Sequence, residues 1–369
     1  MGGGQTLIGM SDEARIVAEA GRLSGLALGR FMVLRRGARN VVIKARVDDA
    51  SSEVVIKAAL TEEHLLAREC AALQRVNLLP DARLYVPRLL AHDSERGIEV
   101  MEVVADAKSL DDYLNGVDGT AANTALVNTA YALSRLHAAT ARPTDCDDLD
   151  LTKEQSESFM RLEPAIREIY ELAGVTWSQG VETDYARIAW QLANPGSAMA
   201  FTVGDMAPSN VLVRKEGIVF IDFEYAGCRH ALYDAVFWRC ICPMPAGIAR
   251  QMDEAYQAGW AAAGRPWAAG TYAPAMTLLA GHRALWSLTW GMKALWDKDR
   301  EMIPGVSGRR LMRNWLRGFY RFARQSNELP ALAEATERLE QARGARWPES
   351  EGDILFPVFA GDAKDERKN

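Results

Sequence analysis

The stretch that most constrains this 369-residue chain runs from Phe201 to Glu224, where two short apolar segments flank a polar turn. The segments 210–214 and 218–222 are alternating or rich in β-branched residues, a pattern that favours strands. The link Lys215-Glu216-Gly217 supplies the turn chemistry that joins two such strands. The sequence therefore predicts a β-hairpin with a polar loop in front of it.

Three oxygen-bearing side chains belong to this stretch. Asp205 lies in the loop before the first strand, and the hairpin is expected to return Asp222 close to Asn210. Taken singly, an Asp next to Gly and an Asn before a strand are usually turn or cap residues. Taken together, two carboxylates and an amide oxygen are hard ligands of the kind that suits Mg²⁺ shared with substrate phosphates. The pattern therefore indicates phosphoryl transfer.

The spacing Asp-x-x-x-x-Asn followed by apolar-Asp-Phe resembles the catalytic loop and metal-binding segment of kinase-fold enzymes. The residues GD at 204–205, PSNVLV at 208–213 and IDFEYAG at 221–227 are most similar to the aminoglycoside phosphotransferase and choline kinase family, whose members phosphorylate small molecules. The resemblance implies that Asp205 accepts or orients the proton of a substrate hydroxyl, while Asn210 and Asp222 hold Mg²⁺. The family commonly has His two residues before the catalytic Asp, where this chain has Val203, which cannot donate a hydrogen bond.

A lysine and a glutamate in the N-terminal part of the chain form a second predicted part of the site. Lys57 ends an apolar strand run, and a helix is expected over 61–76 with Thr61 as its N-cap. Glu69 lies on the apolar stripe of that helix and needs a partner, because an unpaired buried charge is costly. We expect Lys57 to be that partner, since the kinase fold uses such a pair to hold the lysine toward nucleotide phosphates. Glu62 and Glu63 are alternatives for the lysine, although they are placed to suit the helix dipole.

The remaining nucleotide contacts are expected from a hairpin and from a hinge. The hairpin turn with Arg36, Gly37 and Asn40 could lie over nucleotide phosphates, although a plain turn explains it equally well. Glu102 and Val104 fall in the expected hinge, whose backbone would pair with adenine. These five residues, with Lys57 and Glu69, are the predicted contacts for ATP or GTP as co-substrate.

The expected fold class is α/β, more narrowly α+β: a two-lobed protein-kinase-like fold with a five-stranded antiparallel N-terminal lobe and a mainly helical C-terminal lobe. Strands are predicted near 31–34, 40–47, 53–58, 86–92 and 97–104. We expect residues 1–104 to form the nucleotide-binding lobe, with a leader helix capped by Ser11. Residues 105–360 would form the helical lobe with the catalytic loop and the acceptor site, and 361–369 a charged tail.

Composition limits the partners. The net charge of −6 gives no global basic field, and nucleic-acid-binding motifs are lacking, so no nucleic acid partner is expected. No apolar run reaches about 18 residues, which argues against a membrane span. The five cysteines have no zinc-site spacing and are expected to be reduced thiols of a cytoplasmic protein. The oligomeric state stays open.

The acceptor cannot be read from these motifs. An aminoglycoside-type antibiotic, a choline- or ethanolamine-like amine and a sugar-like metabolite all remain open. Trp286, Trp290, Trp296 and Trp315 could line an aromatic box for a quaternary ammonium group, although a packed core is favoured. Three other functions are weighed and disfavoured: a protein kinase, because Asp-Phe-Glu replaces Asp-Phe-Gly; a non-catalytic nucleotide-binding scaffold; and a metal-dependent phosphohydrolase.

Overall fold

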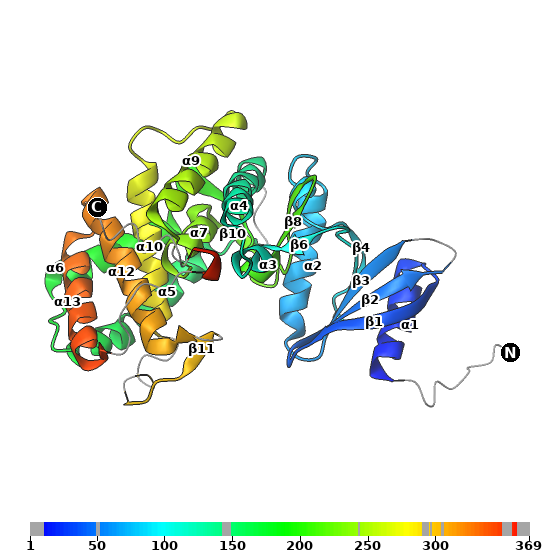
Figure 1. Ribbon diagram of the computed structural model, residues 1–369, viewed down its shortest axis with the longest axis horizontal. Helices are drawn as coiled ribbons and strands as arrows, with labels where there is room; N and C mark the ends of the chain where they lie inside the picture. Colours follow the sequence, from blue (N-terminus) through cyan, green and yellow to red (C-terminus); the bar gives the residue numbers. More distant parts are fainter. Residues whose placement is uncertain are drawn as a thin grey trace. The chain divides into compact units, whose positions relative to one another are not determined.

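The computed structural model describes residues 11–48, 52–141, 149–242, 244–289, 295, 297–303, 306–348 and 356–359. The chain forms two compact units, which are described separately (Figure 1). The first comprises Met1–Lys108, Val203–Asp205 and Leu212–Ala226, and the second comprises Ser109–Thr202, Met206–Val211 and Gly227–Asn369. The first unit therefore combines the N-terminal part of the chain with most of the predicted hairpin.

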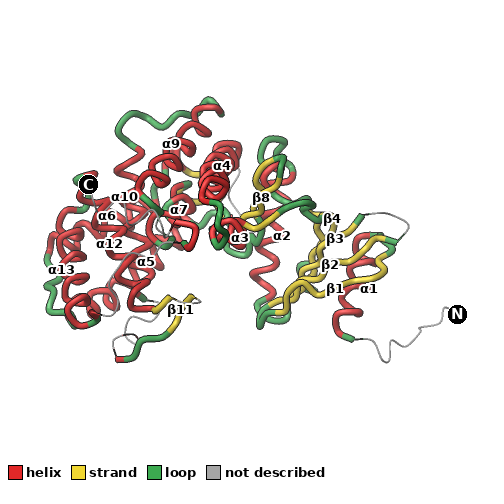
Figure 2. Tube along the Cα trace, in the orientation of Figure 1, coloured by secondary structure: helices red, strands yellow, loops and turns green. Residues whose placement is uncertain are grey.

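A five-stranded antiparallel sheet organises the first unit (Figure 2). Its strands are β1 (Leu28–Arg36), β2 (Asn40–Val47), β3 (Glu53–Ala59), β4 (Leu89–Asp93) and β5 (Ile98–Glu102). They lie in the order β1-β2-β3-β5-β4. The sheet and the mostly helical remainder of the described chain confirm the predicted α+β fold.

Helix α1 (Asp12–Ser24) covers one face of this sheet, and Ser11 Oγ caps it by accepting the Ala14 N–H at 3.3 Å. Its Val17 and Ala20 belong to a buried apolar cluster with alternating residues of the strands. In β3 these are Val54, Ile56 and Ala58. Because successive side chains of a strand point to opposite faces, Lys57 projects from the other face.

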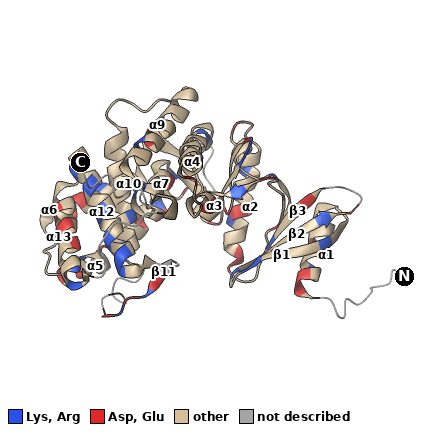
Figure 3. Cartoon of the chain, viewed as in Figure 1, with Lys and Arg blue, Asp and Glu red and all other residues tan. Residues whose placement is uncertain are grey.

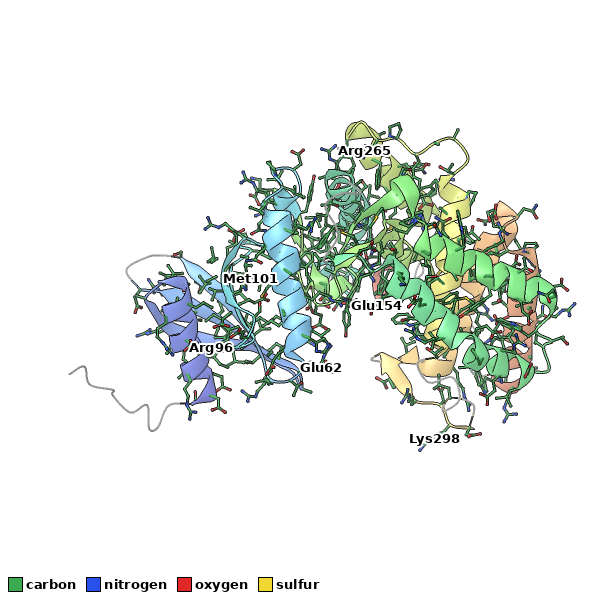
Figure 4. The ribbon with its side chains drawn as sticks, turned by 180° about the vertical axis from the view of Figure 1, so that it is seen from behind. Glu62, Arg96, Met101, Glu154, Arg265 and Lys298 are labelled. Atoms are coloured by element: carbon green, nitrogen blue, oxygen red, sulfur yellow. The ribbon has the colours of Figure 1, made fainter. Side chains whose placement is uncertain are left out.

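Helix α2 (Glu63–Asn77) buries a stripe with Leu66, Glu69 and Leu73, as the apolar periodicity predicts. The prediction that Thr61 caps this helix is wrong. Glu62 occupies the N-cap position with a left-handed backbone, φ 56°, and lies at one end of α2 (Figure 4). Thr61 is held elsewhere, since its N–H donates to the Arg39 carbonyl oxygen at 3.2 Å.

The predicted hairpin is present as β8 (Val211–Arg214) and β9 (Gly217–Phe220), which are hydrogen-bonded neighbours in a small sheet. The second strand ends two residues earlier than expected. Asp222 therefore lies just beyond β9, with its backbone in the left-handed region at φ 67°. A non-glycine residue in that region is uncommon outside functional sites and tight turns.

The second unit is mainly helical, and its helices include α4 (Gly119–Thr140), α9 (Ala246–Ala262) and α10 (Tyr272–Leu288). The other α-helices described in this unit are α3 (Leu110–Leu114), α5 (Thr152–Glu171), α6 (Gln179–Ala193), α7 (Leu232–Ala235), α8 (Phe237–Cys240), α12 (Gly308–Ser326) and α13 (Pro330–Arg346). A two-stranded antiparallel ladder, β7 (Met199–Thr202) with β10 (Gly227–His230), lies among them (Figure 1).

Close helix packing and buried charge pairs hold the second unit together. A Cβ added at Gly259 of α9 would lie 1.6 Å from Ser134 Oγ of α4, so glycine is required where these helices meet. Basic and acidic residues lie side by side on α12 and α13 (Figure 3). Arg313 Nε and Arg317 Nε donate to Glu340 Oε1 at 2.9 and 2.8 Å. These charges therefore neutralise one another within the fold.

One cysteine prediction is wrong. Cys228, in β10, is disulfide-bonded, and its partner lies outside the described residues. Cys70, Cys240 and Cys242 are not disulfide-bonded. A disulfide depends on which cysteines the fold brings together, and the spacing of the five residues gives no indication of that. In the described part of the chain, no helix combines the length and apolarity needed to cross a membrane.

Candidate functional site

Lys57 of β3 is the centre of a buried charge cluster in the first unit. Its Nζ lies 2.5 Å from Glu69 Oε2 and 2.6 Å from Asp222 Oδ1. Burial alone would lower the pKa of Lys57, but the charges of Glu69 and Asp222 outweigh it and hold that pKa above its usual range. The ion pair expected from the sequence is therefore present, while its role toward a nucleotide stays a prediction.

Glu69 also fixes the backbone next to Asp222. Its second oxygen, Oε1, accepts the N–H of Phe223 at 3.1 Å. The glutamate side chain is only 1% exposed, so both of its bonds form in a place from which water is excluded. One carboxylate thus joins β3, α2 and the segment after β9.

Glu99 of β5 is a third carboxyl group beside this cluster, and it is absent from the predicted site residues. It is the direct partner of Lys57 across the β3–β5 ladder and is completely buried. Its Oε2 accepts from Cys70 Sγ at 3.4 Å, and its Oε1 has no hydrogen-bond partner among the described residues. Burial raises the pKa of Glu99 well above its ordinary value, and the nearby charge of Glu69 raises it further, which favours the neutral acid.

Arg39, in the β1–β2 turn, provides a second cation that the sequence analysis did not select. Its Nη2 donates to Glu224 Oε1 at 2.7 Å and its Nη1 to the Tyr225 hydroxyl at 2.8 Å. The bond to Tyr225 and the charge of Glu224 hold the pKa of Arg39 above its usual range. Glu224 in turn lies 4.0 Å from Lys57 Nζ. Arg39 and Lys57 are therefore linked through a single acidic side chain.

The three residues predicted to contact phosphates, Arg36, Gly37 and Asn40, have different surroundings in the structure. Asn40 lines a small cavity together with Arg39, Lys57 and Glu224. Arg36 is instead paired with Glu13 of α1. Gly37 closes the turn, since its N–H donates to the carbonyl oxygen of Asn40 at 2.9 Å. The turn thus contributes Asn40 and Arg39 to the cavity that contains the lysine.

The expected hinge residues, Glu102 and Val104, lie at the end of β5 and just beyond it. The N–H of Glu102 donates to the Arg88 carbonyl at 3.0 Å, and its carboxylate accepts the Arg88 N–H at 3.1 Å. Val104 lies just beyond β5 and is partly buried. Arg88 therefore fixes Glu102 at the end of β5. Glu102 lies two residues before Val104 in the sequence.

Asp205 and Asn210 belong to different units. Asp205 is partly buried and follows Gly204, whose φ of 93° suits glycine, and the buried Val203. Asn210 ends a short 3₁₀ helix, Pro208–Asn210, and its Oδ1 accepts from Ser209 Oγ at 3.4 Å. Carboxylate and amide oxygens are ligands that suit Mg²⁺. Lys57 contacts Oδ1 of Asp222, and 24% of the Asp222 side chain is exposed, so this carboxylate is accessible to an ion.

Other polar residues of the second unit have packing roles. His137 is completely buried, with its Nδ1 2.7 Å from the Tyr256 hydroxyl and its Nε2 3.1 Å from Asp234 Oδ2. Trp315 is buried and donates to the Ile241 carbonyl at 3.2 Å, as expected of core packing. Trp290 and Trp296 lie outside the described residues.

Comparisons with known proteins identify the family and the fold. The model of a family described as a phosphotransferase enzyme family matches residues 31–272. Among solved structures, a choline kinase LicA from Streptococcus pneumoniae is 15% identical, with 86% of this chain and 99% of that chain covered and a TM-score of 0.52. An ADP-bound aminoglycoside phosphotransferase APH(2'')-Ib is 13% identical, with 88% and 99% covered and a TM-score of 0.52.

A choline/ethanolamine kinase family protein from Mesorhizobium loti is 18% identical, with 89% of this chain and 99% of that chain covered and a TM-score of 0.50. At these identities the likeness shows the fold. No curated protein matches the sequence.

Proposed function

The chain belongs to the phosphotransferase enzyme family, and we propose that it transfers the γ-phosphoryl group of ATP or GTP to a hydroxyl group of a small molecule. The observation that carries the proposal is the Lys57 cluster, in which one lysine contacts Glu69 at 2.5 Å and Asp222 at 2.6 Å. A strand lysine held by a helix glutamate next to a metal-binding Asp is the arrangement that kinase-fold enzymes use for phosphoryl transfer.

Lys57 donates to the α and β phosphates in the proposed reaction. Glu69 keeps the ammonium group in place and cannot move without breaking its bond to Phe223. Arg39 and Asn40 lie on the same cavity and provide further donors for phosphate oxygens. The backbone from Glu102 to Val104 receives the nucleotide base. Arg36 and Gly37, proposed from the sequence as phosphate contacts, are the weakest members of the set, since Arg36 is paired with Glu13.

Asp205 accepts the proton of the acceptor hydroxyl. The oxygen of that hydroxyl forms the new bond to the γ phosphorus, while the bond between the γ phosphorus and the β-phosphate oxygen breaks. Asn210 and Asp222 would hold Mg²⁺, which would supply positive charge to neutralise the β and γ phosphates. No covalent intermediate on the chain is needed, because phosphoryl transfer of this kind depends on positioning and charge stabilisation.

The acceptor is a small hydroxyl compound, with an aminoglycoside-type antibiotic or another cationic, sugar-like molecule as the first candidate. Choline- and ethanolamine-like amino alcohols are the alternative. The structural neighbours include both kinds of kinase, and they do not separate the two. The first test is a screen of ADP release from MgATP and MgGTP across aminoglycosides, amino alcohols and sugars.

Asp205→Ala is the control for that screen, because it removes the proposed proton acceptor and leaves the Lys57 cluster intact. We expect at least one acceptor class to stimulate turnover in the natural enzyme and none to do so in the variant. A chain that binds no Mg-nucleotide and responds to no acceptor would contradict the proposed function. Release of free phosphate without a phosphorylated product would instead indicate a phosphohydrolase.

A further inference from the structure

A cavity of about 660 Å³ lies within the second unit, separate from the Lys57 cluster of the first unit. It is lined by residues at the end of α6, by the loop after α9 and by the first turns of α10. Its volume is in the range that holds one small organic molecule. None of the roles proposed above uses the residues of this cavity.

The cavity lies at one end of the two-stranded β7–β10 ladder. His230 and Ala198, which line it, lie at the end where His230 pairs with Met199. The chain leaves the opposite end, where Thr202 pairs with Gly227, and continues toward Asp205. Three residues of strand separate the two ends, which is about 10 Å. Within the second unit, the cavity therefore lies at the end of the ladder opposite to Thr202 and Gly227.

An aromatic cluster forms part of the wall. The ring of Trp267 lies 5.6 Å from that of Trp260, 6.3 Å from that of His230 and 5.4 Å from that of Tyr272, measured between centroids. Pro266 and Pro274 border the same space. Such a wall favours a flat, apolar ring system.

One buried polar group in the cavity wall, the His230 ring, is a hydrogen-bond donor. His230 is 1% exposed, and its Nδ1 accepts the N–H of Leu232 at 3.2 Å. The proton of the neutral ring is therefore on Nε2, which leaves this atom as a donor, because the hydrogen bond of the ring to the backbone uses Nδ1. Burial lowers the pKa of His230 to about 3, so the ring stays neutral at physiological pH.

Arg265 gives the cavity its charge. It lies in the loop after α9 (Figure 4) and is the one ionised side chain among the described residues that line the space. None of those lining residues is acidic, although the whole chain has a net charge of −6. The local charge is thus opposite to that of the protein and suits an anion.

We propose that this cavity binds a small aromatic carboxylate, with its ring against Trp260 and Trp267 and its carboxylate bonded to His230 Nε2–H and Arg265. The ring supplies the apolar contact, and the carboxylate supplies the acceptors that both donors need. The site is a second ligand site, independent of the nucleotide and of the phosphoryl acceptor.

The test uses 2-naphthoate as the probe, with titration calorimetry and quenching of tryptophan fluorescence as readouts. Its neutral counterpart, 2-naphthalenemethanol, and its cationic counterpart, 2-naphthylmethylammonium, have the same ring system. We expect one 2-naphthoate per chain, with the alcohol and the ammonium compound binding at least about tenfold more weakly, the effect of one charge-assisted hydrogen bond. Binding should persist in saturating MgADP, because the nucleotide has its own site.

Two variants and one control locate the probe. His230→Phe keeps a ring beside Trp267 and removes the donor, and Arg265→Gln removes the charge; each should weaken 2-naphthoate about tenfold and leave the alcohol unchanged. Arg250→Gln is the matched control, since Arg250 is an exposed arginine on α9 that does not line the cavity. Arg265 is exposed, so its variant keeps the test valid even if His230→Phe fails to fold.

The proposal is overturned by any of three results: equal affinity for the carboxylate and the alcohol, unchanged affinity in the folded Arg265→Gln variant, or displacement of 2-naphthoate by MgADP. Failure of the proposed phosphotransferase activity would leave these outcomes unaffected, because none of them requires turnover.

Discussion

Glu99 stands directly opposite Lys57 in the β3–β5 ladder, completely buried, while the lysine makes its short contacts with Glu69 and Asp222 instead. The cluster thus has two buried carboxyl groups in different surroundings. Glu69 is held by an ammonium group and by a backbone N–H, whereas the surroundings of Glu99 favour the neutral acid. Replacement of the carboxyl group by an amide should therefore affect Glu69 and leave Glu99 nearly unaffected.

Glu69→Gln should lower stability by about 3 kcal/mol and weaken nucleotide binding, because Lys57 loses a buried ionic partner. Glu99→Gln is the matched variant and should leave both quantities nearly unchanged, since it replaces a neutral acid with a neutral amide. Urea unfolding and ADP titration of the two variants measure the difference. Equal losses would show that Glu99 is ionised in the folded protein.

The pH dependence of stability should also distinguish Glu99. The pKa of this carboxyl group is raised in the folded state, so the folded chain retains a proton that the unfolded chain releases above its ordinary value of 4.5. The stabilisation is complete below that pH and is lost as the pH rises toward the folded pKa, by at most about 1.4 kcal/mol per pH unit. Unfolding free energies of the natural chain minus those of Glu99→Gln should therefore fall from pH 4.5 upward, and a difference that rises would be contrary to this assignment.

Asp205→Asn should reduce kcat by about 10² to 10⁴, the usual contribution of a positioned general base. The amide has the same shape as the carboxylate, so the melting temperature and the affinity for Mg-nucleotide should not change. Single-turnover measurements with saturating acceptor separate the chemical step from binding. A variant with unchanged kcat would remove Asp205 from the proposed mechanism.

Asp222→Asn should raise the concentration of free Mg²⁺ needed for half-maximal turnover by about tenfold or more, because an amide oxygen is a poorer ligand than a carboxylate for this ion. Asn tolerates the left-handed backbone at this position, so the substitution adds little strain. Asp106→Asn makes the same change at another left-handed aspartate, φ 52°, and serves as the control. An identical magnesium dependence in both variants would count against Asp222 as a ligand.

His137→Phe should lower the free energy of unfolding by about 2 kcal/mol, because Tyr256 and Asp234 each lose a buried hydrogen-bond partner. At a temperature where the variant is folded, kcat should match that of the natural chain, since the histidine belongs to the packing of α4 against α9. Thermal unfolding and initial rates test the two parts. A loss of kcat without a loss of stability would assign His137 to the chemistry.

Local patterns in the sequence predict a large part of this arrangement. The β8–β9 hairpin depends on residues close together in the chain, and the stripe of α2 identifies Glu69 as an inward carboxylate. Glu99 could have been suspected for the same reason, as a charged residue within the apolar strand Ile98–Glu102. Its relation to Lys57, however, depends on the strand order, in which β5 rather than β4 adjoins β3.

The rest depends on contacts between distant parts of the chain. Arg39 reaches Glu224 across 185 positions, and no periodicity near either residue indicates this bond. The disulfide of Cys228, and the N-cap position of Glu62 where Thr61 was predicted, also depend on such distant contacts. Thr61 is held by the β1–β2 turn and therefore does not cap α2. Cys228 forms a disulfide with a partner outside the described residues.

The two bonds of Glu69 have a thermodynamic consequence. Because one carboxylate connects α2 to both Lys57 and the backbone of Phe223, displacement of α2 changes the energies of the lysine and of the Asp222 segment together. If the proposed nucleotide site is correct, a molecule that binds the outer surface of α2 and shifts this helix would alter the affinity for nucleotide by some factor. Linkage then requires that nucleotide alter the affinity of that molecule by the same factor.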